Sequence, residues 1–78
     1  MKSIEVRLST IADVQEFVGI VARTPIDIDL CSGRYVVDAK SIMGIFSLDL
    51  SKPITLVANC DEAKAAEFFA KIAAFVVE

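Results

Sequence analysis

Histidine is absent from the 78-residue chain. This absence removes the commonest general base and the commonest metal ligand. Cysteine occurs only at Cys31 and Cys60, which lack metal-ligand spacing, and both are interpreted as free thiols that behave as small hydrophobes. The eight lysines and arginines are scattered singly, which argues against a nucleic-acid partner because phosphate neutralisation needs clustered cations. We expect no catalytic residues, no metal and no cofactor.

Long apolar runs are also lacking. No run approaches the roughly 20 residues that span a bilayer, and the first residues lack the order of a signal peptide. We therefore expect a cytoplasmic protein without a membrane partner. The composition is 55% hydrophobic and 24% charged with a net charge of −3, which suits a compact fold. Residues 1–78 are too few for two cores, so one domain is predicted, and a monomer is favoured over any particular oligomer.

The first third of the chain predicts a strand followed by a helix. Apolar and polar residues alternate over Ser3–Leu8, which is typical of a strand with one buried face. Ser9-Thr10 supplies a helix cap, with Asp13 three residues after Thr10 as a weak capping-box partner, and an apolar stripe predicts a helix over Ile11–Arg23. Gly19 interrupts this helix and is expected to mark a close approach to another element.

A hairpin is predicted next. Ile26–Leu30 alternates strictly, with Asp27 and Asp29 on the face opposite the aliphatic residues. Two aspartates could suggest a metal site, but no third ligand is near in sequence, so a solvated face is the preferred interpretation. Cys31–Gly33 is expected to be the turn, and Arg34–Asp38 the returning strand.

The stretch after this hairpin predicts a short helix with apolar residues on more than one face. Ser41 is a suitable N-cap, and Ile42, Ile45 and Phe46 recur at helical spacing, while Met43 falls off that stripe. One face can pack against the core. The other needs a further explanation.

The last third predicts a strand over Ile54–Ala58 and a helix capped by Asp61. The apolar face of this helix comprises Ala65, Phe68, Phe69, Ile72, Phe75 and Val76. The order βαββαβα predicts an α+β fold in which one four-stranded antiparallel sheet is covered by three helices on a single face. A ferredoxin-like split βαβ arrangement is the nearest competitor.

The segment Lys40–Leu48, KSIMGIFSL, resembles the sequence around the regulatory serine of HPr, the small phosphocarrier of the sugar phosphotransferase system. The order of elements is similar as well. The resemblance implies a single HPr-like domain, an open-faced β-sandwich in which the first strand neighbours the fourth and the fourth neighbours the second. In that topology Cys31 and Cys60 would lie at opposite edges of the sheet, which argues against a disulfide.

The region that corresponds to the phosphocarrier site of HPr departs from the family pattern. HPr carries phosphate on a histidine within a Gly-Ile/Leu-His-Ala-Arg-Pro pattern at the start of its first helix. Here the matching positions are Thr10, Ile11, Ala12 and Asp13. The resemblance therefore implies a degenerate site without histidine phosphotransfer.

The regulatory serine is retained as Ser41. The resemblance implies that a dedicated kinase phosphorylates it, while simple helix capping is the competing interpretation. Lys40, Ile42, Met43 and Phe46 match the surface that binds HPr's partner proteins; alternatively, Ile42 and Phe46 belong to the core. Ile45 and Leu48 are assigned to the core.

Three hypotheses follow. The first is a regulatory protein of carbon control that binds a kinase and a transcriptional regulator or enzyme through the Ser41 helix. The second is a constitutive interaction or structural module with the same fold and no phospho-switch. The third, least favoured, is an unorthodox phosphocarrier that uses Thr10 or Asp13.

Overall fold

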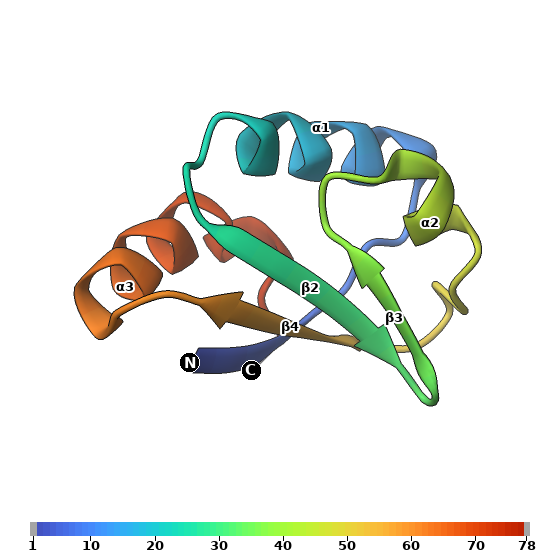
Figure 1. Ribbon diagram of the computed structural model, residues 1–78. Helices are drawn as coiled ribbons and strands as arrows, with labels where there is room; N and C mark the ends of the chain where they lie inside the picture. Colours follow the sequence, from blue (N-terminus) through green and yellow to red (C-terminus); the bar gives the residue numbers. More distant parts are fainter. Residues whose placement is uncertain (1, 78) are drawn as a thin grey trace.

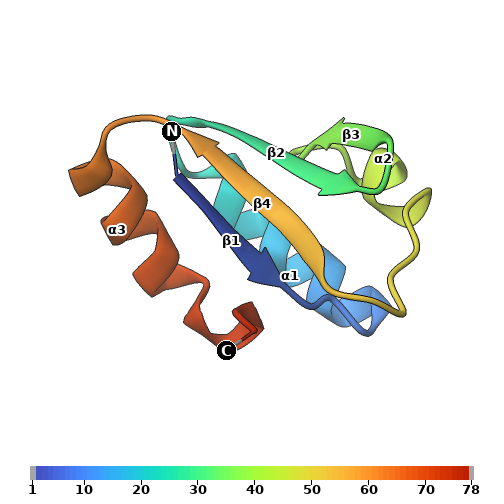
Figure 2. The same ribbon diagram turned by 90° about the horizontal axis from the view of Figure 1, so that it is seen from below.

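A computed structural model describes residues 2–77. One layer of helices covers one face of a four-stranded sheet, as Figures 1 and 2 show from two sides. The elements are β1 (Lys2–Val6), α1 (Ile11–Ala22), β2 (Asp27–Ser32), β3 (Tyr35–Asp38), α2 (Ile42–Phe46), β4 (Ile54–Asn59), α3 (Glu62–Lys71) and a 3₁₀ helix (Ala73–Phe75). The predicted α+β fold class and the order of elements are confirmed.

All strand pairs of the sheet are antiparallel, in the order β1-β4-β2-β3. In the centre Leu56 of β4 lies between Ile4 of β1 and Leu30 of β2. Alternation decides which face each residue occupies: Ile28 and Leu30 are buried under the helices, whereas Asp27 on the open face is exposed. The solvated interpretation therefore fits Asp27, whereas Asp29 is half-buried and its Oδ2 accepts from Nδ2 of Asn59 at 3.3 Å.

The hairpin turn lies one to two residues later than predicted. Cys31 and Ser32 belong to β2, and the turn consists of Gly33 and Arg34. The pairing of Cys31 with Thr55 extends β2 along β4, and this ladder outweighs the local turn preference of the Cys-Ser pair. Gly33 has φ = +59°, the conformation that a type II′ hairpin turn requires at its first central position.

The core lies between the sheet and the helices. Its fully buried large side chains come from all the layers and include Phe17 of α1, Leu30 of β2, Ile45 of α2 and Phe68 of α3. Phe17 packs edge-on against Phe75, with ring centroids 6.0 Å apart. The core assignment of Ile45 is thus confirmed.

The end of the chain differs from the prediction. The apolar pattern continues to Val76, but α3 ends at Lys71, and the chain turns through the 3₁₀ helix. The N–H of Arg7 then donates to the carbonyl of Phe75 (2.8 Å), and the N–H of Val77 donates to the carbonyl of Glu5 (2.9 Å). These bonds cover the outer edge of β1, which a longer α3 could not do. Within residues 2–77, no helix is long and apolar enough to cross a membrane.

Candidate functional site

The residues before α2 are held by a series of short hydrogen bonds. The N–H of Lys40 donates to Oδ1 of Asp38 (2.8 Å), and the N–H of Ser41 donates to the Asp38 carbonyl (2.9 Å). Ser41 is the N-cap of α2, and its Oγ accepts from the N–H of Gly44 at 3.1 Å. The predicted capping role of Ser41 is confirmed. The side chain is at the same time exposed to solvent.

Gly44 allows α2 to pack closely on β3. A Cβ atom at this position would lie 3.0 Å from Oγ of Ser41 and 3.2 Å from Cβ of Val37. Gly19, the glycine for which the sequence predicted a close approach, has only the tip of Arg23 within 4 Å of such an atom, at 3.8 Å. That prediction is wrong, because Gly19 is on a part of α1 where there is space for a side chain.

The two faces of α2 have different surroundings. Ile45 is fully buried and Leu48, just after the helix, is 6% exposed, which confirms both as core residues. Met43 is 79% exposed and Phe46 is 42% exposed, so α2 presents apolar side chains to solvent. Ile42 is half-buried against the core. The interpretation of these residues as core therefore holds in part for Ile42 and not for Phe46.

The four residues that the resemblance matches to the phosphocarrier site, Thr10 to Asp13, lie at the start of α1, a helix that contacts α2 (Figure 1). Thr10 is the N-cap, with its Oγ1 accepting from the N–H of Asp13 at 3.0 Å. Oδ2 of Asp13 in turn accepts from the N–H of Ser9 at 3.1 Å. Both polar side chains are thus engaged in capping. Ala12 is exposed, and Ile11 is 65% exposed.

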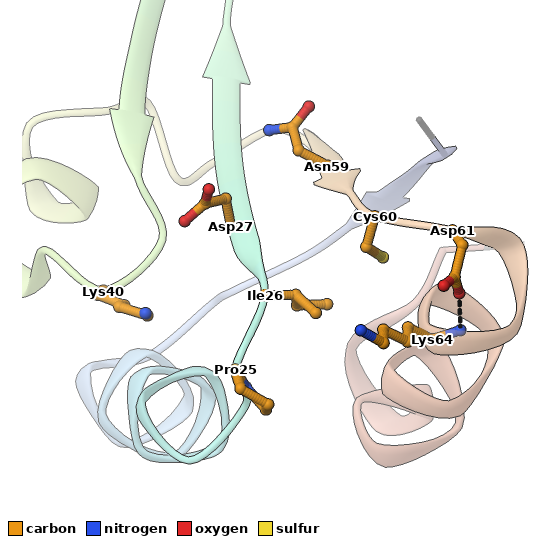
Figure 3. A pocket seen from close by; sticks show the side chains of 8 residues that line it. All are labelled: Pro25, Ile26, Asp27, Lys40, Asn59, Cys60, Asp61 and Lys64. Atoms are coloured by element: carbon orange, nitrogen blue, oxygen red, sulfur yellow. Dashed lines mark hydrogen bonds between the residues drawn. The ribbon is translucent and has the colours of Figure 1, made fainter.

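A pocket of about 290 Å³ lies at the opposite end of β3 from the hairpin turn and includes Lys40 (Figure 3). Lys40 extends into this pocket, and across it lies Lys64 from α3. Asp27 and Asp61 bring negative charges, and Oδ1 of Asp61 already accepts from the N–H of Lys64 at 2.8 Å. Cations and carboxylates therefore alternate here, and no single sign of charge is favoured.

The remaining reactive groups are separated. Cys60 lines the same pocket, whereas Cys31 lies towards the other end of β2, and both are free thiols, as expected. Among residues 2–77, no group of three or more carboxylates and thiols could hold a metal ion. Helix α2 and its N-cap thus combine an exposed hydroxyl, on Ser41, with exposed apolar side chains, Met43 and Phe46.

The sheet order and the exposed helix define a class: small α+β proteins with an open-faced antiparallel sheet and a short helix, α2, that presents apolar side chains to solvent. Residues 13–78 match the family model described as PTS HPr component phosphorylation site. The chain belongs to this HPr family of the phosphotransferase system. The ferredoxin-like competitor is therefore wrong.

Solved structures of HPr proteins are similar over nearly the whole chain. HPr-C-His from Thermoanaerobacter tengcongensis is 26% identical with a TM-score of 0.74, covering 92% of this chain and 90% of that one. The phosphocarrier protein HPr from Bacillus anthracis str. Ames is 30% identical with a TM-score of 0.71, and the coverages are 97% and 94%.

A regulatory relative is similar as well. Crh, the catabolite repression protein of Bacillus subtilis, is 25% identical with a TM-score of 0.64, covering 96% of this chain and 90% of that one, and was described as an intertwined, domain-swapped dimer. A search of curated protein sequences found no match.

Proposed function

We propose that this chain is a regulatory protein of the phosphotransferase system that binds partner proteins through the α2 surface, defined by Lys40, Ser41, Ile42, Met43 and Phe46. The observation that supports this function best is the exposure of Met43 and Phe46 beside an exposed Ser41, on a helix whose inward residue Ile45 is fully buried. The partners are cytoplasmic proteins of carbon control, namely a kinase and a transcriptional regulator or enzyme. Histidine phosphotransfer is not part of the function because the chain has no histidine.

Ser41 is the proposed switch. A phosphate adds a charge of about −1.5 to −2 at neutral pH. On the exposed Ser41 this charge would lie at the N-terminal end of α2, the helix that exposes Met43 and Phe46, and would add an anionic group to an apolar surface. A partner with cationic groups around an apolar socket would then prefer the phosphorylated form, because complementary charge chiefly determines specificity.

The test is the intact mass of the protein after incubation with ATP and a kinase that modifies HPr on serine, beside an authentic HPr. The expected result is a gain of one phosphate that Ser41→Ala abolishes. Ser47→Ala is the matched control, because Ser47 is also exposed and lies at the other end of α2. An unmodified protein beside a modified HPr would contradict the proposed switch.

The alternative function is a constitutive interaction module. It is favoured by the hydrogen bond from the N–H of Gly44 to Ser41, because capping by itself accounts for a serine at this position. A partner captured by the wild type and by Ser41→Ala, but lost in Phe46→Asp, would support this alternative over the switch.

Phosphotransfer through Thr10 or Asp13 has less support, since each side chain already accepts a backbone hydrogen bond. Phosphorylation by Enzyme I and phosphoenolpyruvate would revive it.

A further inference from the structure

The sheet has two edges, and only one of them is covered. On the outer side of β1, residues Arg7 and Glu5 bond to Phe75 and Val77. At the other end of the sheet, β3 pairs with β2 on one side, and no described residue forms a ladder with its other side. Figure 2 shows β3 at this free end, with α2 behind it. The free edge of β3 therefore differs from the edge of β1.

The backbone direction along β3 follows from one hydrogen bond. The N–H of Ala39 donates to the carbonyl of Ile28 on β2 at 2.9 Å. Alternation along a strand then directs the backbone groups of Val37 and Tyr35 towards β2 and those of Val36 and Asp38 outwards. The N–H and C=O of Val36 are thus available to a further strand.

This free edge carries few of the features that protect natural edge strands. Tyr35 is 70% exposed and Val36 is 64% exposed. Of the usual devices against edge pairing, β3 has a short length of four residues, but it contains no lysine, proline or bulge. Its charges lie only at the two ends, as Arg34 in the turn and Asp38 as the last residue of the strand.

The positions of these charges are self-complementary. If β3 lies antiparallel to β3 of a second copy with Val36 opposite Val36, then Arg34 of each copy lies opposite Asp38 of the other. Asp38 is also directly opposite Asp29 of β2, an arrangement of like charges that is unfavourable. Within residues 2–77 neither carboxylate has a cation within 4.0 Å, since the ion pair formed is Lys2–Glu62. Arg34 of a second copy would supply that cation.

We propose that the chain self-associates through the free edge of β3, which pairs with the same edge of a second copy about Val36. The outward N–H and C=O of the two Val36 residues bond to each other, and the two Arg34–Asp38 pairs fix the register. The sheets of the two copies become one continuous sheet. The contact rests on a strand of four residues, so the dimer is weak and exchanges rapidly with the monomer.

The test is sedimentation velocity at protein concentrations rising to about 1 mM, the range of weak contacts. The wild type is expected to shift from monomer to dimer. Val36→Lys places two ammonium groups opposite each other and is expected to weaken the dimer at least tenfold. Ile11→Lys is the matched control, because Ile11 at the start of α1 is 65% exposed, close to the 64% of Val36, and the variant is expected to leave the dimer unchanged.

A charge exchange tests the register. Arg34→Asp alone and Asp38→Arg alone each place like charges opposite one another, so each variant is expected to remain monomeric. An equimolar mixture of the two variants pairs opposite charges at both ends and is expected to form a heterodimer. Asp38→Arg also removes the hydrogen bond from the N–H of Lys40 to Asp38, which lowers the stability of that variant. This loss does not affect the test, because the charges of the two variants remain complementary in the mixture.

Three outcomes would overturn the proposal. If the wild type stays monomeric, the free edge of β3 does not pair with a second copy, and an extended segment of another protein becomes its candidate partner. A dimer that persists in Val36→Lys forms through a different surface, such as exchange of a segment between copies. A mixture of the charge variants that stays monomeric excludes the register about Val36.

Discussion

The two helical glycines Gly19 and Gly44 should respond in opposite directions to replacement by alanine. A glycine inside a helix is less favourable than alanine by about 0.5–1 kcal/mol. At Gly19 a Cβ meets ordinary space, with the tip of Arg23 at 3.8 Å. Gly19→Ala should therefore raise the free energy of unfolding by about 0.5–1 kcal/mol, or Tm by roughly 2–8 °C in a domain of this size.

At Gly44 the same gain is opposed by three close contacts, two of them with Ser41 and one with Val37. The added Cβ would lie 3.0 Å from Oγ of Ser41 and 3.2 Å from Cβ of Val37, so α2 must move away from β3 or Ser41 must rotate. Overpacking typically costs about 1–3 kcal/mol, and a lost N-cap about 1 kcal/mol. Gly44→Ala should thus lower the free energy of unfolding by about 1–2 kcal/mol, after subtraction of the helix propensity gain.

Urea unfolding of four proteins checks this reasoning: wild type, Gly44→Ala, Ser41→Ala and the double variant. Removal of Oγ in Ser41→Ala deletes the closest contact of the new Cβ. The double variant should therefore be more stable than the sum of the two single effects predicts, by at least about 0.5 kcal/mol. Additive effects would show that Oγ of Ser41 is not the atom that opposes a side chain at Gly44, and a stabilised Gly44→Ala would refute the close approach altogether.

Two further predictions concern other polar groups. The hydrogen bonds from the side chain and the backbone N–H of Ser51 hold the pKa of Asp49 below its usual value, with a smaller effect of the nearby lysine. Because the folded pKa is depressed, ionised Asp49 contributes stability above the unfolded pKa, and this contribution is lost as the pH falls through the folded pKa. An NMR titration should show the lowered Asp49 pKa in the wild type and a rise in Ser51→Ala, and an equal pKa in both would refute the cause. Thr10→Ala should lower the free energy of unfolding by about 1 kcal/mol, measured by thermal unfolding, because the N–H of Asp13 loses its acceptor; an unchanged stability would contradict the cap.

The parts of the fold that local chemistry determines could be predicted from the sequence. All three predicted N-caps, Thr10, Ser41 and Asp61, are confirmed. Each cap depends only on a side-chain oxygen and an N–H three residues later. The strands with strict alternation were predicted to within one or two residues. These local patterns do not predict the order of the strands in the sheet. That order was predicted only from the resemblance to HPr.

The errors occur where tertiary contacts decide. Apolar spacing continues from Ile72 to Val76, yet α3 ends because the last residues pair with β1 instead. The hairpin turn shifted because Cys31 extends the ladder with β4. In each case a backbone partner distant in sequence overrode the local pattern, and no inspection of the local sequence could reveal it.

For the candidate site, helical spacing predicts which side chains of α2 face the core, but not how neighbouring elements surround them. The exposure of Met43 and the burial of Ile45 follow from helical spacing. The exposure of Ile11 and the extension of Lys40 into the pocket depend on how separate elements meet, so the sequence held no signal for them.

The energetics of α2 give the strongest reason to regard its outer face as a binding surface. Burial of a Met or Phe side chain contributes about 1.5–3 kcal/mol, and Met43, at 79% exposure, gains little of this in the free protein. Stability therefore gives no reason for an apolar residue at this position, whereas it does so at Ile45. A partner that covers Met43 and Phe46 would recover that free energy on binding, and Ser41 lies where a phosphate would alter the same contact.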